Sequence, residues 1–484
     1  AVDVSSFAFV SQHLPHAASK QLVRQPKSST GSTCSSLTVT FGLSSATVPA
    51  VVASLALRSR QRGRCLLRKV AVGTGTEQSD ERAYQELAEW LRARGAFIDD
   101  AVGLVSTDPV AGQSQAERER GCAATRDVRK GELLLEIPTS CCLSAQPGAA
   151  DAVVADPAVA AALQSASIKQ EDAALALAVL NERKAGDKSG WWPYLRMLGD
   201  CRETFPLFFS EDDLDALDSP PLKESLETTS KAIASVAAMH GVPDKELRSA
   251  WQLVISRRFG SDLGTVMIPL GDFMNHSLYP SAAWEPPTAA RPESWICRAK
   301  IDIAAGESIN FSYCEDPNHL LLSTLGCVMK ENPHDRIMVR PADLRKSLEL
   351  VSNQESPLEF QGFRRTEFKK QVPDVEEEGI GMGMFLVGRR PGGVQWNPLW
   401  LDLVGLAVCE SAEKPWSQEI GGMERYLEAL ETASWSVFSR KLEDEPQLLP
   451  SASPNQVLAS ELRTGQKLLL QNALAGIRER LVPS

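Results

Sequence analysis

The chain lacks the cysteine spacing of a metal-binding or disulfide-stapled protein. Its ten cysteines are scattered through 484 residues, and none forms a Cys-x-x-Cys pair. This pattern indicates neither a zinc ribbon nor a disulfide framework. We therefore expect reduced thiols in a reducing compartment and no bound metal.

Basic residues are few beyond the N-terminal segment. Residues 1–76 carry nine Lys or Arg and one acid, Asp3, whereas the remaining chain holds 42 basic and 61 acidic residues, a net charge of −19. Phosphate binding requires clustered Lys and Arg side chains. The acidic body therefore argues against nucleic acid or an anionic membrane as a main partner.

The sequence also has little that could cross a membrane. The mostly apolar run 41–57 contains Ser, Thr and Pro and is shorter than the roughly 20 residues of a transmembrane helix. Residues 1–76 are rich in Ser and Thr and poor in acids, which is typical of a plastid or mitochondrial transit peptide. We predict that this segment is disordered and directs the protein to one of these two organelles. A membrane anchor is the alternative for the segment.

The rest of the chain alternates between β-like and helical patterns. At 43% hydrophobic residues, it is long enough to bury more than one core. Apolar residues at helical spacing predict a helix over 80–94, and residues 121–138 indicate strand, turn and strand. An Ala- and Leu-rich helical pattern follows over about 150–257, and short β-like runs then return at 265–270, 295–303 and 307–313.

After about residue 336 the pattern becomes helical. Asn397 and Pro398 can cap and open a helix. An apolar stripe with spacings of four, three and four residues lies near the C-terminus, at Leu470, Leu474, Ile477 and Leu481. This half is predicted to be a separate helical domain.

Four stretches carry residues that could do chemistry, and each has a simpler structural explanation. The first could be only a β-hairpin, the arginines of the second a solvated helix end, and the tyrosine of the fourth a strand residue with a hydrated hydroxyl. The stretches are 117–132 (ERERGCAATRDVRKGE), 256–259 (SRRF), 268–277 (IPLGDFMNHS) and 306–328 (GESINFSYCEDPNHLLLSTLGCV).

The third stretch places Asp272 four residues before His276. Taken alone, this spacing fits a metal ligand pair, an acid/base pair or the start of a helix with Asp272 as its cap. A metal site needs a third ligand, and none follows at a useful spacing. The helix start is favoured over a metal for an isolated Asp-x-x-x-His.

Taken together, the order and spacing of the stretches resemble the SET-domain methyltransferases. The similarity is to the branch that includes the Rubisco large-subunit lysine methyltransferase and the actin-histidine methyltransferase, and it extends from about residue 80 to the C-terminus. Asp-x-x-Asn-His-Ser followed some 30 residues later by Gly-Glu-x(4)-Ser-Tyr is specific to that fold. The matching segments include ATRDVRKGELLLEIP, LNERKAGDKSGWWPYLRML, SRRF, IPLGDFMNHS, AGESINFSY and NPHDRIMV.

The resemblance implies an α+β fold with three regions. A SET-domain β-fold would occupy residues 80–335, interrupted by a helical insertion at about 150–255 and closed by a knot-like threading of the chain, an exception to the usual avoidance of threaded chains. An all-α substrate-binding domain would occupy residues 336–484.

The resemblance also implies S-adenosyl-L-methionine as the cofactor. Asn275 and His276 match the residues that bind it, and Arg257 matches an arginine near its carboxylate, where a guanidinium gives a charge-assisted bond. The loop that ends at Gly121 normally adds backbone contacts. Here Glu119 and Arg120 replace a more glycine-rich sequence. The resemblance still implies that these two residues bind the cofactor.

Tyr313 matches the catalytic tyrosine of the family. Asp272 and Trp284 match the substrate side of the site, and Leu325 stands where the branch often has a channel tyrosine. That departure leaves open the number of methyl groups transferred and the target. A Cys-rich tail after the tyrosine is common in histone-directed members, and its absence favours a non-histone substrate.

With the transit-like segment, the resemblance favours the chloroplast stroma as the location, and the mitochondrion or cytoplasm is the alternative. The resulting prediction is a plastid protein-lysine N-methyltransferase that acts on the Rubisco large subunit or another plastid enzyme. A protein-histidine methyltransferase is one alternative. A catalytically weak SET-like interaction module is another.

Overall fold

The computed structural model describes most of the chain after residue 74. The described residues are 75–106, 120–199, 204–262, 264–351, 384–390, 393–408, 421–448 and 451–481. The transit-like segment predicted for residues 1–76 therefore lies almost wholly outside them.

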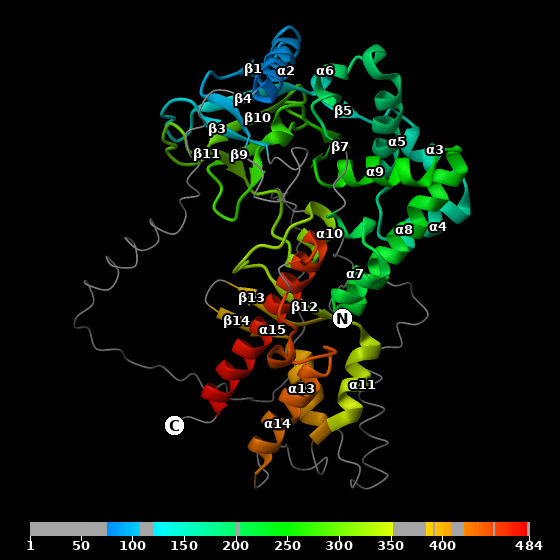
Figure 1. The fold of residues 1–484 in the computed structure, drawn as a ribbon, viewed down its shortest axis with the longest axis vertical. Helices are drawn as coiled ribbons and strands as arrows, with labels where there is room; N and C mark the ends of the chain where they lie inside the picture. The colour runs from blue at the N-terminus through cyan, green and yellow to red at the C-terminus, as the bar shows by residue number, and fades with distance from the viewer. Residues whose placement is uncertain are drawn as a thin grey trace, which may run out of the picture. The chain divides into compact units, whose positions relative to one another are not determined.

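The first helix, α2 (Gly75–Arg92), is amphipathic as the sequence predicts. Leu87 and Leu91 are fully buried and one helical turn apart, and Tyr84 completes the stripe. The Tyr84 hydroxyl donates a hydrogen bond of 2.8 Å to the Val102 carbonyl. In Figure 1 this helix lies beside β1, which it contacts.

Two four-stranded sheets form the β part of the first core. One has the order β1–β4–β10–β9 and is antiparallel throughout, and the other has the order β2–β3–β11–β8. The bounds of the first are Phe97–Ile98, Leu133–Pro138, Ser294–Ala299 and Ala282–Glu285; those of the second are Val102–Ser106, Arg120–Ala124, Ser308–Phe311 and Asn275–His276. Strands β3 and β4 follow each other in the sequence but belong to different sheets and do not pair. The interpretation of residues 117–132 as a β-hairpin is therefore wrong.

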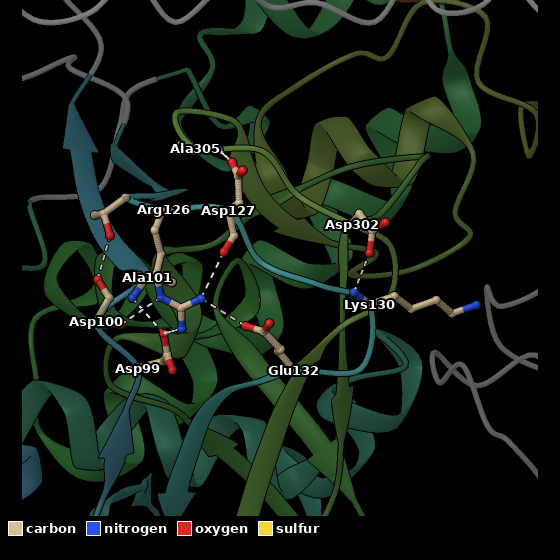
Figure 2. Close-up of polar contacts among 10 residues, drawn as sticks. Asp99, Asp100, Ala101, Arg126, Asp127, Lys130, Glu132, Asp302 and Ala305 are labelled. Atoms are coloured by element: carbon tan, nitrogen blue, oxygen red, sulfur yellow. Dashed lines mark hydrogen bonds and ion pairs between the residues drawn. The ribbon is translucent and has the colours of Figure 1, made fainter.

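The turn between β3 and β4 is held by an exposed cluster of charges, drawn in Figure 2. The Arg126 guanidinium contacts Asp99 at 2.7 Å and both Asp100 and Glu132 at 3.1 Å. The Lys130 backbone N–H donates to the Asp302 carboxylate at 2.8 Å. These contacts fasten the turn to the β1–β2 connection and to the loop before β11.

A helical segment separates β5 from β6, as the sequence predicts. It follows β5 (Leu143–Ser144), which pairs with β7 (Gly264–Met267), and β7 pairs with β6 (Arg258–Ser261). Its principal contacts are α5 with α9 and α4 with α8. The helices are α3 (Ala149–Val153), α4 (Pro157–Ser165), α5 (Gln170–Ala185), α6 (Trp192–Leu195), α7 (Glu211–Ala216), α8 (Pro220–His240) and α9 (Asp244–Ile255).

The C-terminal region has helices and a sheet. The helices are α10 (Asn318–Leu325), α11 (Pro341–Val351), α13 (Pro398–Val408), α14 (Gly422–Trp435) and α15 (Pro454–Leu481). The sheet has the order β12–β13–β14, with the bounds Arg336–Val339, Met384–Arg390 and Gly393–Trp396. The sheet corrects the expectation of an all-α C-terminal domain. Its strands β13 and β14 form a short hairpin, with Arg390 opposite Gly393. Strand β12 pairs with β13 across about fifty residues, Arg336 opposite Gly388, and such a distant pairing leaves no local signal.

The last helix is also tied to the segment between α7 and α8. Lys467 is fully buried and donates to the Asp218 carboxylate at 3.1 Å and to that of Glu445, while its ammonium lies 5.3 Å from the centre of the Phe438 ring. A buried ammonium is tolerated only when it is paired in this way.

Within the described residues, no helix is long and apolar enough to cross a membrane.

Candidate functional site

The stretch 268–277 forms a tight turn and not the helix start that its spacing allowed. It makes a single turn of 3-10 helix, η5 (Gly271–Phe273), and then a two-residue strand, β8. Leu270 has a φ of +70°, in the left-handed region that side chains rarely adopt. Gly271 has no room for a side chain, since an added Cβ would lie 2.7 Å from Trp284 Cζ2.

Asp272 is buried within this turn and held by two other side chains. Its Oδ2 accepts a hydrogen bond of 2.7 Å from the Tyr194 hydroxyl and one of 3.3 Å from Arg257 Nη1. The same Arg257 nitrogen donates to the Asp272 carbonyl at 3.0 Å. Burial raises the pKa of the Asp272 carboxyl, and Arg257 and Tyr194 partly oppose that rise because they stabilise the ionised form.

Tyr313 reaches the same turn from the segment after β11. Its hydroxyl donates a hydrogen bond of 2.5 Å to the Met274 carbonyl. Burial raises the pKa of this hydroxyl, with the nearby Arg257 cation acting in the opposite direction. The phenol is therefore protonated at neutral pH and acts as a hydrogen-bond donor.

Asn275 and His276 bring two distant parts of the chain together. They form β8, which pairs in parallel with β11, Asn275 opposite Asn310 and His276 opposite Phe311. The Tyr313 backbone N–H donates to His276 Nδ1 at 3.0 Å. A neutral ring that accepts at Nδ1 carries its proton on Nε2, and burial lowers the pKa of this imidazole.

Gly121 lies against this strand from β3. A Cβ on Gly121 would stand 2.7 Å from Asn275 Nδ2. Glycine therefore allows the β3 backbone to approach the Asn275 amide closely.

An aromatic row leads from the core to the tyrosine. The Phe259 ring stacks on Phe311 at 5.4 Å between centroids, and Phe311 lies 4.7 Å from Tyr313. Trp284 meets Phe259 edge-on at 5.6 Å. These apolar rings border one side of the polar cluster.

Three buried polar atoms of this region have no hydrogen-bond partner among the described residues. They are Asp272 Oδ1, His276 Nε2 and Trp284 Nε1. Buried polar groups are normally paired, so these three atoms have hydrogen-bonding capacity that the polar groups of a ligand can satisfy. No cluster of three metal-ligating side chains occurs within the part of the chain that the structure describes.

The structure therefore brings together most of the residues singled out in the sequence. Arg257, Asp272, Asn275, His276 and Tyr313 are joined by direct contacts, and Trp284 and Gly121 lie against them.

The remaining residues are less closely defined. Leu325 is the last residue of α10, and Cys327, two residues on, lies close enough to Tyr313 to affect the pKa of its hydroxyl. Arg120 begins β3, but its side chain, like all of Glu119, lies outside the described residues.

Sequence reasoning missed Tyr194 and the Met274 carbonyl. Tyr194 lies 78 residues before its partner, and nothing in its local pattern distinguishes it from a core aromatic. The Met274 carbonyl belongs to the backbone, which residue types do not reveal.

Residues 119–314 match the family model of the SET domain. The structure is similar to that of the SET domain of LSMT bound to lysine and AdoHcy, with 16% sequence identity, coverage of 82% of this chain and 91% of that chain, and a TM-score of 0.52. It is also similar to Rubisco LSMT bound to AdoMet, with 17% identity, coverage of 82% and 92%, and a TM-score of 0.52. A comparison with curated protein sequences finds no match. At these identities the likeness to the solved structures is one of fold.

Proposed function

Because the chain carries a SET domain, we propose that it is an S-adenosyl-L-methionine-dependent protein-lysine N-methyltransferase. The observation that carries the proposal is the meeting of the Tyr313 hydroxyl with the β8–β11 pair at a turn lined by unpaired buried polar atoms. The similar solved structures support it, since their titles name AdoMet, AdoHcy, lysine and methyllysine as bound molecules.

The residues around β8 fit the proposed cofactor. His276 Nε2 is buried and unpaired among the described residues, so a nearby polar group of a ligand would satisfy it. The β3 backbone at Gly121 lies close against the Asn275 amide, so backbone groups of β3 would stand beside the cofactor that Asn275 binds. When bound, the cofactor supplies a methyl group already activated by its sulfonium, so the protein needs to position the reactants more than to supply acid or base.

Tyr313 and the turn at Asp272 would act on the acceptor side. A free lysine has a pKa of about 10.4 and must lose its proton before its nitrogen can attack. Burial beside apolar rings such as Phe311, near a cationic donor, favours the neutral amine. The Tyr313 hydroxyl and nearby carbonyls would orient the neutral amine toward the methyl group that the cofactor would supply.

The protein substrate is proposed to be the Rubisco large subunit or another enzyme of the plastid. The acid-poor character of residues 1–76 and the fold shared with Rubisco LSMT support this choice.

The test is Tyr313→Phe, which removes one hydroxyl and leaves the ring. Turnover should fall about 100-fold, the effect of deleting one donor that acts in the transition state, while S-adenosylhomocysteine binding measured by isothermal titration is retained. Tyr279→Phe is the matched control because Tyr279 is 87% exposed, and it should turn over at the wild-type rate. An unaffected rate in Tyr313→Phe would remove Tyr313 from the mechanism, and the absence of binding heat with the wild type would refute the cofactor.

A further inference from the structure

The helical segment between β5 and β6 sends one polar group into the site. Tyr194, on α6, is fully buried, and its ring packs beside Phe273 at 6.3 Å between centroids. Its hydroxyl donates to Asp272 Oδ2 at 2.7 Å. This bond joins the helical segment directly to η5.

Burial of the Tyr194 hydroxyl costs desolvation free energy, and the packing of the ring does not require a hydroxyl. Burying a hydroxyl and a carboxylate is unfavourable unless they are paired, and a phenylalanine would fill the same space without a polar atom. The hydroxyl is therefore best explained by what it does to the carboxylate. Of the two carboxylate oxygens, it engages the one that Arg257 also engages, so the two donors together fix the orientation of the Asp272 side chain.

That orientation is connected to the tyrosine through a short stretch of backbone. Arg257 binds both the carboxylate and the carbonyl of Asp272. Two residues later, the Met274 carbonyl accepts the Tyr313 hydroxyl. A turn free to move at Asp272 would therefore move the acceptor that places the Tyr313 hydroxyl.

The ionisable groups near Asp272 come from several elements. Arg257 follows α9, Tyr194 lies on α6, Tyr313 follows β11, and the buried Cys122 thiol lies on β3. Arg257 is the cation among these four groups. Within the described part of the chain, Tyr194 and Arg257 are the two side chains that hydrogen-bond the Asp272 carboxylate. Removing the Tyr194 hydroxyl would leave the ionised carboxylate with one donor fewer.

We propose that Tyr194 is a positioning residue for methyl transfer, which fixes Asp272 and through it the turn that places the Tyr313 hydroxyl. The inference rests on the proposed function. It assigns to the helical segment a role in the chemistry of the site in addition to its packing.

The test compares Tyr194→Phe with Tyr84→Phe. Both tyrosines are buried and both donate one hydrogen bond, but Tyr84 donates to the Val102 carbonyl beneath α2. We expect Tyr194→Phe to lower kcat about tenfold, as for the loss of a hydrogen bond to a charged group, with KM for the cofactor unchanged at neutral pH. The acid limb of its pH–rate profile should move to higher pH, because the carboxylate has lost a donor. Tyr84→Phe should keep both the wild-type kcat and the wild-type profile.

A double-mutant cycle with Asp272→Asn gives a second measure. If Tyr194 acts through Asp272, adding Tyr194→Phe to Asp272→Asn should lower kcat less than twofold. The pH dependence of S-adenosylhomocysteine binding should shift in Tyr194→Phe as the rate profile does, which is a readout independent of turnover. If the wild type is active and Tyr194→Phe matches Tyr84→Phe in kcat, profile and binding, the inference is overturned and the proposed function stands. If the wild type neither binds S-adenosylhomocysteine nor transfers a methyl group, the proposed function fails and the inference fails with it.

Discussion

Gly271 should be among the least replaceable residues of the site, and Gly271→Ala tests the geometry of the turn. The added methyl would meet Trp284 Cζ2 at 2.7 Å and Cη2 at 2.9 Å, and Ile268 Cγ2 at 2.9 Å. Carbon atoms in contact prefer about 3.5–4.0 Å. The indole would therefore have to shift by about 1 Å, and Phe259, edge-on at 5.6 Å, obstructs that movement.

Overpacking of this kind costs about 1–3 kcal/mol. We expect a value near the upper end, because three contacts are too short at once. At an unfolding entropy of about 2.1 cal/mol/K per residue, a loss of about 2–3 kcal/mol lowers the Tm of a chain of 484 residues by about 2–3 °C. Thermal unfolding followed by tryptophan fluorescence measures the shift.

Two further variants make the result specific. Gly476→Ala is the matched control, since Gly476 lies inside α15 and its Cβ would meet no atom within 4 Å. This change should stabilise the protein by about 0.4–1 kcal/mol by restricting the unfolded chain. Trp284→Phe should reduce the cost of Gly271→Ala, because the smaller ring lacks the clashing carbons. A Gly271→Ala protein that unfolds at the wild-type temperature would refute this account of the turn.

Two other predictions concern buried ionisable groups. Lys467→Ala should destabilise the protein by about 3 kcal/mol in denaturant unfolding, because it leaves the largely buried Asp218 carboxylate without its cation, while Glu445 keeps its ion pair with Arg463. Leu468→Ala, at a side chain 42% exposed, should cost far less, and equal effects would contradict the pairing. Burial lowers the pKa of His276 from 6.5, so the unfolded chain takes up the proton first and stability should fall as the pH drops below about 6.5 towards the folded pKa. Tm measured from about pH 8 to about pH 5 should fall less steeply in His276→Asn than in the wild type, and equal slopes would argue against a neutral ring that accepts from Tyr313.

Local patterns in the sequence were enough to predict the elements with strong periodicity. The helix at 80–94 corresponds to α2, the run after Asn397 to α13, and the stripe at Leu470, Leu474 and Ile477 to the buried face of α15. In each case the spacing of apolar residues along one helix is enough to show which face is buried. Such elements are visible because the hydrophobic period is local.

Pairing between distant strands was not visible in this way. The sequence places the β-like runs near 295–303 and 307–313 on either side of a short turn, but β10 and β11 belong to different sheets. The same is true of β3 and β4. Sheet order depends on contacts across more than a hundred residues, which periodicity does not encode, and only the resemblance to a known fold indicated that residues 275–276 and 310–311 would meet.

Some residues of the candidate site could likewise be predicted from the sequence, and others could not. Arg257, His276 and Tyr313 have residue types and spacings that identify them as candidates. Tyr194 does not, because the neighbouring sequence of a buried tyrosine is the same whether its ring only fills the core or its hydroxyl also holds Asp272.

The central claim is methyl transfer to lysine, and one measurement tests it most directly. The protein is incubated with isotope-labelled S-adenosyl-L-methionine and a plastid stromal extract, and the labelled residues are identified by mass spectrometry, with Tyr313→Phe as the control. The account predicts labelled methyl-lysine in a stromal protein, formed by the wild type and largely lost in the variant. Labelled methyl-histidine in place of methyl-lysine, or no transfer at all, would contradict it.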